Sequence, residues 1–171
     1  YATGGYICTS PFPYDGIFRR AVLNFKFHNC GAYAELLSHE MVRSIKDVYR
    51  DREFDLVTCV PMHKDTLRER GYNQAELLAK ECARLLGIEY ADLLAKTKKN
   101  KTQHSIKAAE RAKNVIGVYS PIDKNLIKGK RILIIDDIIT TGSTLGECAR
   151  ILNKCKCGEI CCCTLCTSLL I

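Results

Sequence analysis

Two adjacent carboxylates are the residues of this sequence best suited to chemistry. Asp136 and Asp137 follow the four apolar residues 132–135 and precede a turn rich in threonine, glycine and serine. Two carboxylates at the end of a buried strand are costly without a partner, and carboxylates accept hydroxyl donors or metal ions. We therefore expect both side chains to contact sugar hydroxyls or Mg²⁺, with the metal bound through water. The alternative is a helix N-cap beside a stray acidic pair.

The turn after the two acids has the composition of a phosphate-binding loop. Gly142 lets the backbone approach a ligand closely, and the next helix would direct its first N–H groups toward the turn. Hydroxyl donors are supplied by Thr140, Thr141, Ser143 and Thr144. The turn lacks the lysine of a GxxxxGK[ST] loop and the spacing of GxGxxG, so neither motif fits. A ribose 5-phosphate, with a phosphate at one end and hydroxyls at the other, would satisfy both the turn and the acids.

Strand-like and helix-like runs alternate along the chain and would position this segment. Apolar spacing predicts helices over 15–28, 31–50, 71–86, 106–113 and 143–154. Short apolar runs predict strands over 54–60, 88–94, 115–119, 131–136 and 159–167. Strands separated by helices predict an α/β fold with a mostly parallel sheet flanked by helices. We divide the chain into a helical N-terminal region, residues 1–50, and a core, residues 51–171.

Basic residues favour anionic partners, since the chain carries a net charge of +7. Lys64, Arg68 and Arg70 follow a predicted strand at the same edge of the sheet as the acids, where they could neutralise a diphosphate. A solvated basic turn is the alternative interpretation. His63 could act as an acid or base, although a lone histidine in a loop is more often a surface residue.

Residues 95–104 contain four lysines and almost no side chain that could be buried, which predicts an exposed loop. We expect the segment 96–113 to close over a bound diphosphate. The negative charge of the diphosphate would be neutralised by Lys98, Lys101 and Arg111. Closure of the segment would also exclude water from the reacting carbon.

Eleven cysteines without a visible secretory signal indicate a reducing compartment, so we expect a cytoplasmic protein. No run approaches the roughly 18 apolar residues of a membrane span. Seven cysteines lie in the last 24 residues, which raises the alternative of a zinc or iron–sulfur site. Alternation along a strand would, however, direct Cys161 and Cys163 away from Cys162, so we interpret these cysteines as core residues.

The run ILIIDDIITTGST resembles the phosphoribosyl diphosphate signature of type I phosphoribosyltransferases. The resemblance implies the fold of that family and a site for 5-phosphoribosyl 1-diphosphate (PRPP) and Mg²⁺. It further implies that Asp136 and Asp137 bind the ribose hydroxyls, directly or through Mg²⁺-bound water, and take part in catalysis. Residues 140–144 would hold the 5-phosphate.

A second stretch, VPMHKDTLRERGYNQAELLAKECARLLGI, resembles the ComF-like proteins associated with competence for DNA uptake. The stretch TQHSIKAAERAKNV resembles the T-x-Q…R-x-x-N segment of the same group, matched by Thr102, Gln103, Arg111 and Asn114. The resemblance implies a substrate contact for Gln103 and a catalytic role for Arg111. Many relatives begin with a four-cysteine zinc ribbon. This sequence has only two cysteines in its first 50 residues, so we do not expect a ribbon within it.

Two functions remain open at this stage. The first is transfer of the phosphoribosyl group from PRPP to an acceptor that the sequence does not identify, with residues 1–50 as the hood over the acceptor. The second is a non-catalytic module that senses PRPP or binds single-stranded DNA. Competence proteins would be its partners. The intact acidic and phosphate-binding segment favours the first, and the basic charge and the ComF-like resemblance favour the second.

Overall fold

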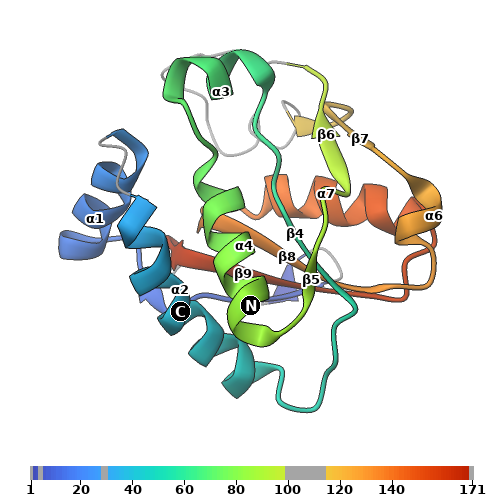
Figure 1. Cartoon of the computed structure of the whole chain (residues 1–171), viewed down its shortest axis with the longest axis horizontal. Helices are drawn as coiled ribbons and strands as arrows, with labels where there is room; N and C mark the ends of the chain where they lie inside the picture. Colours follow the sequence, from blue (N-terminus) through green and yellow to red (C-terminus); the bar gives the residue numbers. More distant parts are fainter. Residues whose placement is uncertain (1, 4–5, 28–30, 99–114, 170–171) are drawn as a thin grey trace.

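The computed structural model describes residues 2–3, 6–27, 31–98 and 115–169, which form a sheet between two layers of helices (Figure 1). The sheet has the order β1-β2-β9-β8-β4-β5, with β3 also paired to β9. All pairs are parallel except β1 with β2, so the predicted mostly parallel α/β architecture is confirmed. The strands are β1 (Ala2–Thr3), β2 (Tyr6–Thr9), β3 (Phe12–Pro13), β4 (Leu56–Cys59), β5 (Glu89–Tyr90), β8 (Arg131–Ile139) and β9 (Glu159–Thr167).

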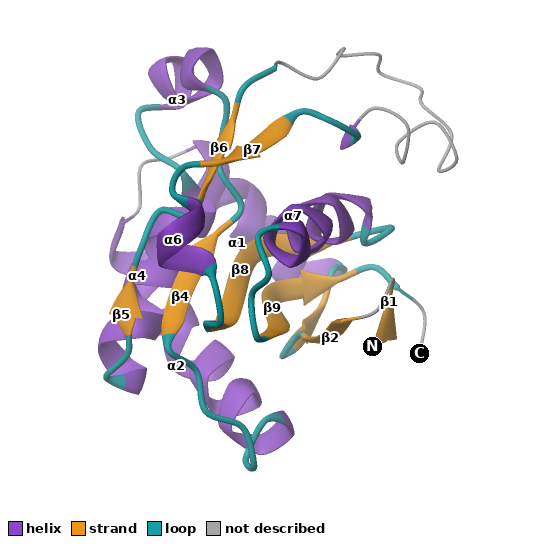
Figure 2. Ribbon diagram, turned by 90° about the vertical axis from the view of Figure 1, so that its right-hand side faces the viewer, coloured by secondary structure: helices purple, strands orange, loops and turns teal. Residues whose placement is uncertain are grey.

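Helices cover both faces of this sheet (Figure 2). One face packs against α1 (Gly16–Phe27), α2 (Gly31–Val48) and α4 (Gln74–Leu86). The other packs against α7 (Ser143–Lys154) and the short α6 (Lys124–Ile127). Beyond the carboxyl end of β4 lie α3 (Lys64–Arg70) and an antiparallel pair, β6 (Leu94–Lys96) with β7 (Tyr119–Pro121) (Figure 2). These last elements stand above the edge of the sheet where the functional residues were predicted.

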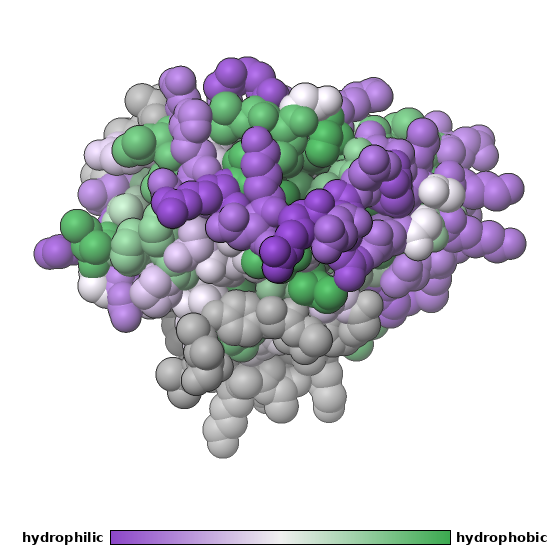
Figure 3. All heavy atoms as spheres, turned by 90° about the horizontal axis from the view of Figure 1, so that it is seen from below, coloured by the Kyte–Doolittle hydropathy of each residue, from purple (hydrophilic) through white to green (hydrophobic). Residues whose placement is uncertain are grey.

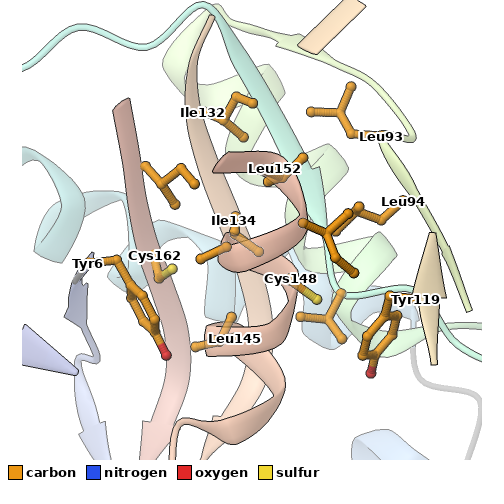
Figure 4. Close-up of a cluster of buried hydrophobic side chains, with 14 of the residues drawn as sticks. Tyr6, Leu93, Leu94, Tyr119, Ile132, Ile134, Leu145, Cys148, Leu152 and Cys162 are labelled. Atoms are coloured by element: carbon orange, nitrogen blue, oxygen red, sulfur yellow. The ribbon is translucent and has the colours of Figure 1, made fainter. Parts of the chain in front are cut away.

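Side chains alternate between the two faces along the central strands. Ile134 and Cys162 point toward α7, where they pack with Leu145 and Cys148 (Figure 4). Cys161 and Cys163 lie in the opposite cluster with α2 and α4. The alternation predicted for these three cysteines is therefore confirmed, and it follows from the two-residue period of a strand.

The cysteines serve mainly as small buried side chains, as the sequence analysis interpreted them. Nine of the described cysteines are buried, and Cys157 is half-buried. Burial raises the pKa of the Cys8 and Cys59 thiols to about 12, which keeps them protonated and unreactive at neutral pH. Within the described ranges, no three His, Cys, Asp or Glu side chains are grouped so that they could hold a metal ion.

Predicted and observed elements differ where tertiary pairing decides the structure. Helix α7 and strand β9 have the predicted bounds, whereas β8 continues three residues past the predicted end. The run 88–94 divides between β5 in the main sheet and the start of β6 in the small one. The strand expected at 115–119 begins only at Tyr119. Short strands of two to four residues carry too few side chains to show a period.

The N-terminal region contributes strands as well as helices. Strand β2 pairs with β9, and the hydroxyl of Tyr49 donates to the carbonyl oxygens of Ile7 (3.0 Å) and Cys162 (2.7 Å). Helices α1 and α2 share one buried cluster with β8 and β9. The division at residue 50 stays a prediction about organisation, while the two parts are joined by a common sheet and core.

The surface is mixed in polarity. Hydrophilic side chains form a band across the face shown in Figure 3, and apolar side chains adjoin it. Ile17 and Leu36, on α1 and α2, are among the exposed large apolar residues. In the described ranges, no helix combines the length and the apolar character needed to cross a bilayer.

Candidate functional site

The carboxyl end of β4 lies beside the second half of β8 and brings the two predicted segments together. The strands pair in parallel up to Cys59 and Ile135, so the residues that follow β4 lie beside Asp136 and Asp137, which are still part of β8. A pocket of about 260 Å³ opens between them. Its lining is Val60, Pro61, Met62, His63, Thr66, Arg70, Asn73, Gln74, Ala75, Lys96, Tyr119, Asp136, Asp137 and Thr144. None of these described lining residues belongs to 1–50, so the hood stays a prediction.

A second, smaller pocket adjoins the first. It measures about 30 Å³ and is lined by Asp136 and by residues 138–145, which include the whole predicted phosphate turn. Asp136 and Thr144 line both pockets. The two pockets thus form one site with a small compartment at the turn and a larger one beyond the acids.

The turn has a backbone conformation that exposes the start of α7. Gly142 has φ 72° in the left-handed region, which a residue with a Cβ adopts only with strain. The N-cap residue Gly142 has no side chain to cap α7, and the Ser143 N–H donates to Thr141 Oγ1 at 3.4 Å. The N-terminus of α7, with the positive end of the helix dipole, lies at this turn and suits an anion. Thr141 Oγ1 and Ser143 Oγ lie 2.8 Å apart. The Tyr6 hydroxyl donates to the Gly142 carbonyl at 2.8 Å, and its ring packs beside Cys162 and Leu145 (Figure 4).

The two acids are half-buried, and the backbone of the second contacts the carboxylate of the first. The backbone N–H of Asp137 donates to Asp136 Oδ1 at 2.9 Å. Both carboxylates line the larger pocket. A pair of partly exposed carboxylates fits Mg²⁺, which in proteins commonly takes one or two carboxylates and completes its shell with phosphate and water oxygens. The donor set therefore suits a metal that arrives with a phosphorylated ligand.

Lys96 is a pocket residue that the sequence analysis placed in the exposed lysine loop. It ends β6, and its Nζ lies 5.6 Å from the centre of the Tyr119 ring. Burial lowers the pKa of Lys96, and the negative charge of Asp136 opposes that shift. A partly desolvated cation is thus held across the pocket from the acids, where an anionic ligand would favour its charged form.

The predicted basic residues lie on a helix, α3, in a segment for which the sequence predicted neither a helix nor a strand. His63, Thr66 and Arg70 recur at helical spacing and line the pocket. Lys64 and Arg68 are exposed on another side of α3 and do not line it. The helical period therefore brings one of the three predicted basic residues to the site and turns the other two away.

His63 is a buried residue rather than the surface residue that its loop position favoured. It is 8% exposed and caps α3, because its Nδ1 accepts from the backbone N–H of Asp65 at 3.3 Å. The same Nδ1 lies 3.5 Å from Asp65 Oδ2, so Asp65 contacts the ring through both its backbone and its side chain.

The start of α4 supplies polar residues that sequence reasoning missed. Asn73 caps the helix by accepting from the Ala75 N–H, and Gln74 follows it on the buried face. A signal was present, since Gln74 stands in the same helical stripe as Leu78 and Cys82, where an apolar residue is expected. A polar residue on the apolar face, at a helix start near a ligand-binding edge, indicates a functional contact.

The remaining predicted residues cannot be compared with the pocket. Gln103 and Arg111, with Thr102, Lys101 and Asn114, lie outside the described residues, as does most of the predicted lid. Lys98 is described and exposed, and it does not line the pocket.

The chain belongs to the phosphoribosyltransferase family. A model of the phosphoribosyl transferase domain matches residues 73–169, more than half of the chain, and this range includes both acids and the turn. Two solved structures share the fold: the glutamine PRPP amidotransferase from B. subtilis complexed with ADP and GMP, and an allosteric regulatory enzyme of purine biosynthesis. Their TM-scores are 0.54 and 0.52, at 18% and 19% identity over 82% and 85% of this chain and 30% of each of theirs. The predicted type I phosphoribosyltransferase fold is thus confirmed.

The resemblance to ComF-like proteins is also confirmed. The chain is 31% identical to competence protein F of Haemophilus influenzae in an alignment that covers 81% of this chain. It is 31% identical to competence protein ComFC of Bacillus subtilis over 88% of this chain. It is 30% identical to the DNA utilization protein YhgH of Escherichia coli over 58% of this chain. The chain spans 63%, 60% and 44% of these relatives, respectively.

Proposed function

We propose that this protein binds PRPP with Mg²⁺ and transfers its phosphoribosyl group to an acceptor. The observation that carries the proposal is the pair of adjoining pockets that share Asp136 and Thr144. A ligand with a phosphate in the smaller pocket must pass over Asp136 to enter the larger one. PRPP has this layout, because its ribose joins a single phosphate to a diphosphate.

Each part of the site has a role in this proposal. The turn 140–144 holds the 5-phosphate through backbone N–H groups and hydroxyls. Asp136 and Asp137 accept from the ribose hydroxyls, and their charge stabilises the positive charge that develops on the sugar as the C1–O bond to diphosphate breaks. Arg70 and Lys96 line the same pocket, and their positive charges would neutralise the departing diphosphate. When bound, Mg²⁺ neutralises diphosphate charge beside the acids.

Titration calorimetry with PRPP tests the binding step. We expect Mg²⁺-dependent binding, because two carboxylates beside a polyanion require a cation between them. The matched arm contains a chelator in place of Mg²⁺. Equal affinity in both arms would remove the metal from the proposal, and no binding in either arm would refute the proposal.

Turnover separates the proposed enzyme from the second candidate. The alternative is a non-catalytic module that senses PRPP or binds single-stranded DNA in DNA uptake, supported by the names of the relatives and the net charge of +7. Labelled PRPP is incubated with nitrogenous bases, amines and water as acceptors. Release of diphosphate that depends on both enzyme and acceptor supports transfer. PRPP binding without release, combined with salt-sensitive binding of single-stranded DNA, supports the module instead.

A further inference from the structure

The larger pocket contains a buried polar atom without a partner. The side chain of Gln74 lines the pocket and the residue is 1% exposed. Its Nε2 makes no hydrogen bond, and it is the one fully buried side-chain nitrogen or oxygen among the described residues of which this is true. A buried donor left unsatisfied destabilises the folded protein, and native proteins retain few of them, so this one requires an explanation.

The neighbouring amide shows that position alone does not explain the missing partner. Asn73 precedes Gln74 and is also buried, yet its Nδ2 donates to the Val60 carbonyl at 3.2 Å and its Oδ1 accepts from the Ala75 N–H at 3.2 Å. Asn73 thus completes the fold, by capping α4 and holding the end of β4. Gln74, one residue later, is buried against the pocket with its donor unused.

The surroundings of Gln74 favour an anionic group as the missing partner. Asp136 and Asp137 line the same pocket, but the proposed function pairs them with the ribose hydroxyls and Mg²⁺. Arg70 and Lys96 also line it, and α4 begins at Gln74 with the positive end of its dipole. Gln74 does not line the smaller pocket at 138–145, so the group that it meets is not the phosphate held there. In PRPP the other anionic group is the diphosphate.

We propose that Gln74 binds the diphosphate, by donating from Nε2 to one of its oxygens. This inference rests on the proposed function, since it takes PRPP as the ligand. A carboxamide is well suited to the task because it donates without adding charge beside Arg70 and Lys96. Because Nε2 is fully buried in the free protein, the side chain must turn toward the pocket when the ligand binds. The free protein therefore carries the cost of the unsatisfied donor.

Two substitutions test the assignment. Gln74→Met keeps the length of the side chain and removes its donors, and Gln74→Glu replaces the donor with a negative charge. The control is Ser38→Ala, because Ser38 is also fully buried against α4, where its hydroxyl donates to the Leu78 carbonyl at 3.4 Å, and does not line the pocket. Each variant and the wild type are titrated with PRPP, inorganic diphosphate and ribose 5-phosphate in the presence of Mg²⁺, and each is melted without ligand.

We expect Gln74→Met to bind PRPP and inorganic diphosphate about 10- to 100-fold more weakly, which is the range for a hydrogen bond to a charged group. Gln74→Glu should be weaker still, while ribose 5-phosphate binding stays near the wild-type value in both. The Tm of Gln74→Met should equal or exceed that of the wild type, because an unsatisfied donor is removed. A structural role would instead lower the Tm, as expected for Ser38→Ala.

The outcomes separate this inference from the proposed function. Wild-type protein that binds neither PRPP nor inorganic diphosphate would refute both. Wild-type binding of PRPP with unchanged affinity in Gln74→Met would overturn the role of Gln74 alone. Equal weakening of ribose 5-phosphate and PRPP in Gln74→Met would also overturn it, since the contact would then be to the sugar or the 5-phosphate.

Discussion

The two ends of strand β8 carry charged residues in different environments, where the first end is Arg131 and the second is the segment from Asp136 to Ile139 that continues past β4. At its start, the Arg131 guanidinium donates to both oxygens of Asp55 (3.1 and 3.0 Å) and to Glu53 at 2.9 Å. At its end, Asp136 and Asp137 face a pocket that also contains Lys96 and the unpartnered Gln74 donor. Charges at the first end pair with each other within the chain, whereas those at the second end line a pocket, where we propose that they meet a ligand. Changes at the two ends should therefore affect different measurements.

The largest expected effect is at the pocket end. Changing Asp136 and Asp137 together to Asn should reduce PRPP affinity more than about 100-fold, because hydroxyl and metal contacts are both lost. Inorganic phosphate binding should change little, since the turn 140–144 is built from other groups. Calorimetry with the two ligands measures both. If phosphate binding were lost as well, the acids would be shown to support the structure of the turn. The second end of β8 would then serve the fold, as the first end does.

Between the levels of the two ends, a substitution inside the sheet should change the free energy of unfolding and not ligand binding. Cys162→Ser places a hydroxyl at a fully buried site facing α7 and should cost about 1–3 kcal/mol of unfolding free energy. Cys157→Ser is the control, because Cys157 is half-buried, and its effect should be much smaller. Chemical denaturation compares the two variants. Equal stability in both would contradict the packing role assigned to Cys162.

A smaller effect is expected from the bond that joins the N-terminal region to the turn. Tyr6→Phe removes the hydrogen bond to the Gly142 carbonyl, worth about 0.5–1.5 kcal/mol, and should weaken PRPP binding about 2- to 10-fold. Tyr49→Phe, whose hydroxyl bonds β2 and β9 away from the turn, controls for the loss of a buried hydroxyl. If both variants bind PRPP as the wild type does, Tyr6 does not position the turn.

The smallest effect at neutral pH is expected at the start of β8. Hydrogen bonds from Arg131 hold the pKa of Asp55 well below its ordinary value of 3.8. A folded-state pKa below the unfolded one contributes stability that is complete above the unfolded pKa and is lost as pH falls through the folded pKa. Asp55→Asn should therefore lower the Tm at pH 7 and pH 5, and the difference should shrink below about pH 4. PRPP affinity at pH 7 should be unchanged, and weaker binding would contradict the separation of the two ends.

Sequence reasoning was strongest where one local pattern specifies an element. The run 131–154 contains a buried strand, two acids, a turn and an amphipathic helix, and the structure places them in that order at one edge of the sheet. It was weaker on residues 64–70, where a short helix with no buried residue has no apolar stripe to reveal it. Lys64 and Arg68 were included with Arg70 for that reason, since charge and position in the chain alone do not distinguish them.

The sequence by itself determined the parallel α/β architecture and the place of the acidic pair and of the turn 140–144, because each depends on neighbouring residues and their period. Only the tertiary structure decided which distant side chains complete the pocket. Lys96 and Tyr119 arrive on β6 and β7, and Gln74 arrives with the start of α4. Their contribution depends on how separate elements pack and on which donors that packing leaves unsatisfied, and neither is encoded in local spacing.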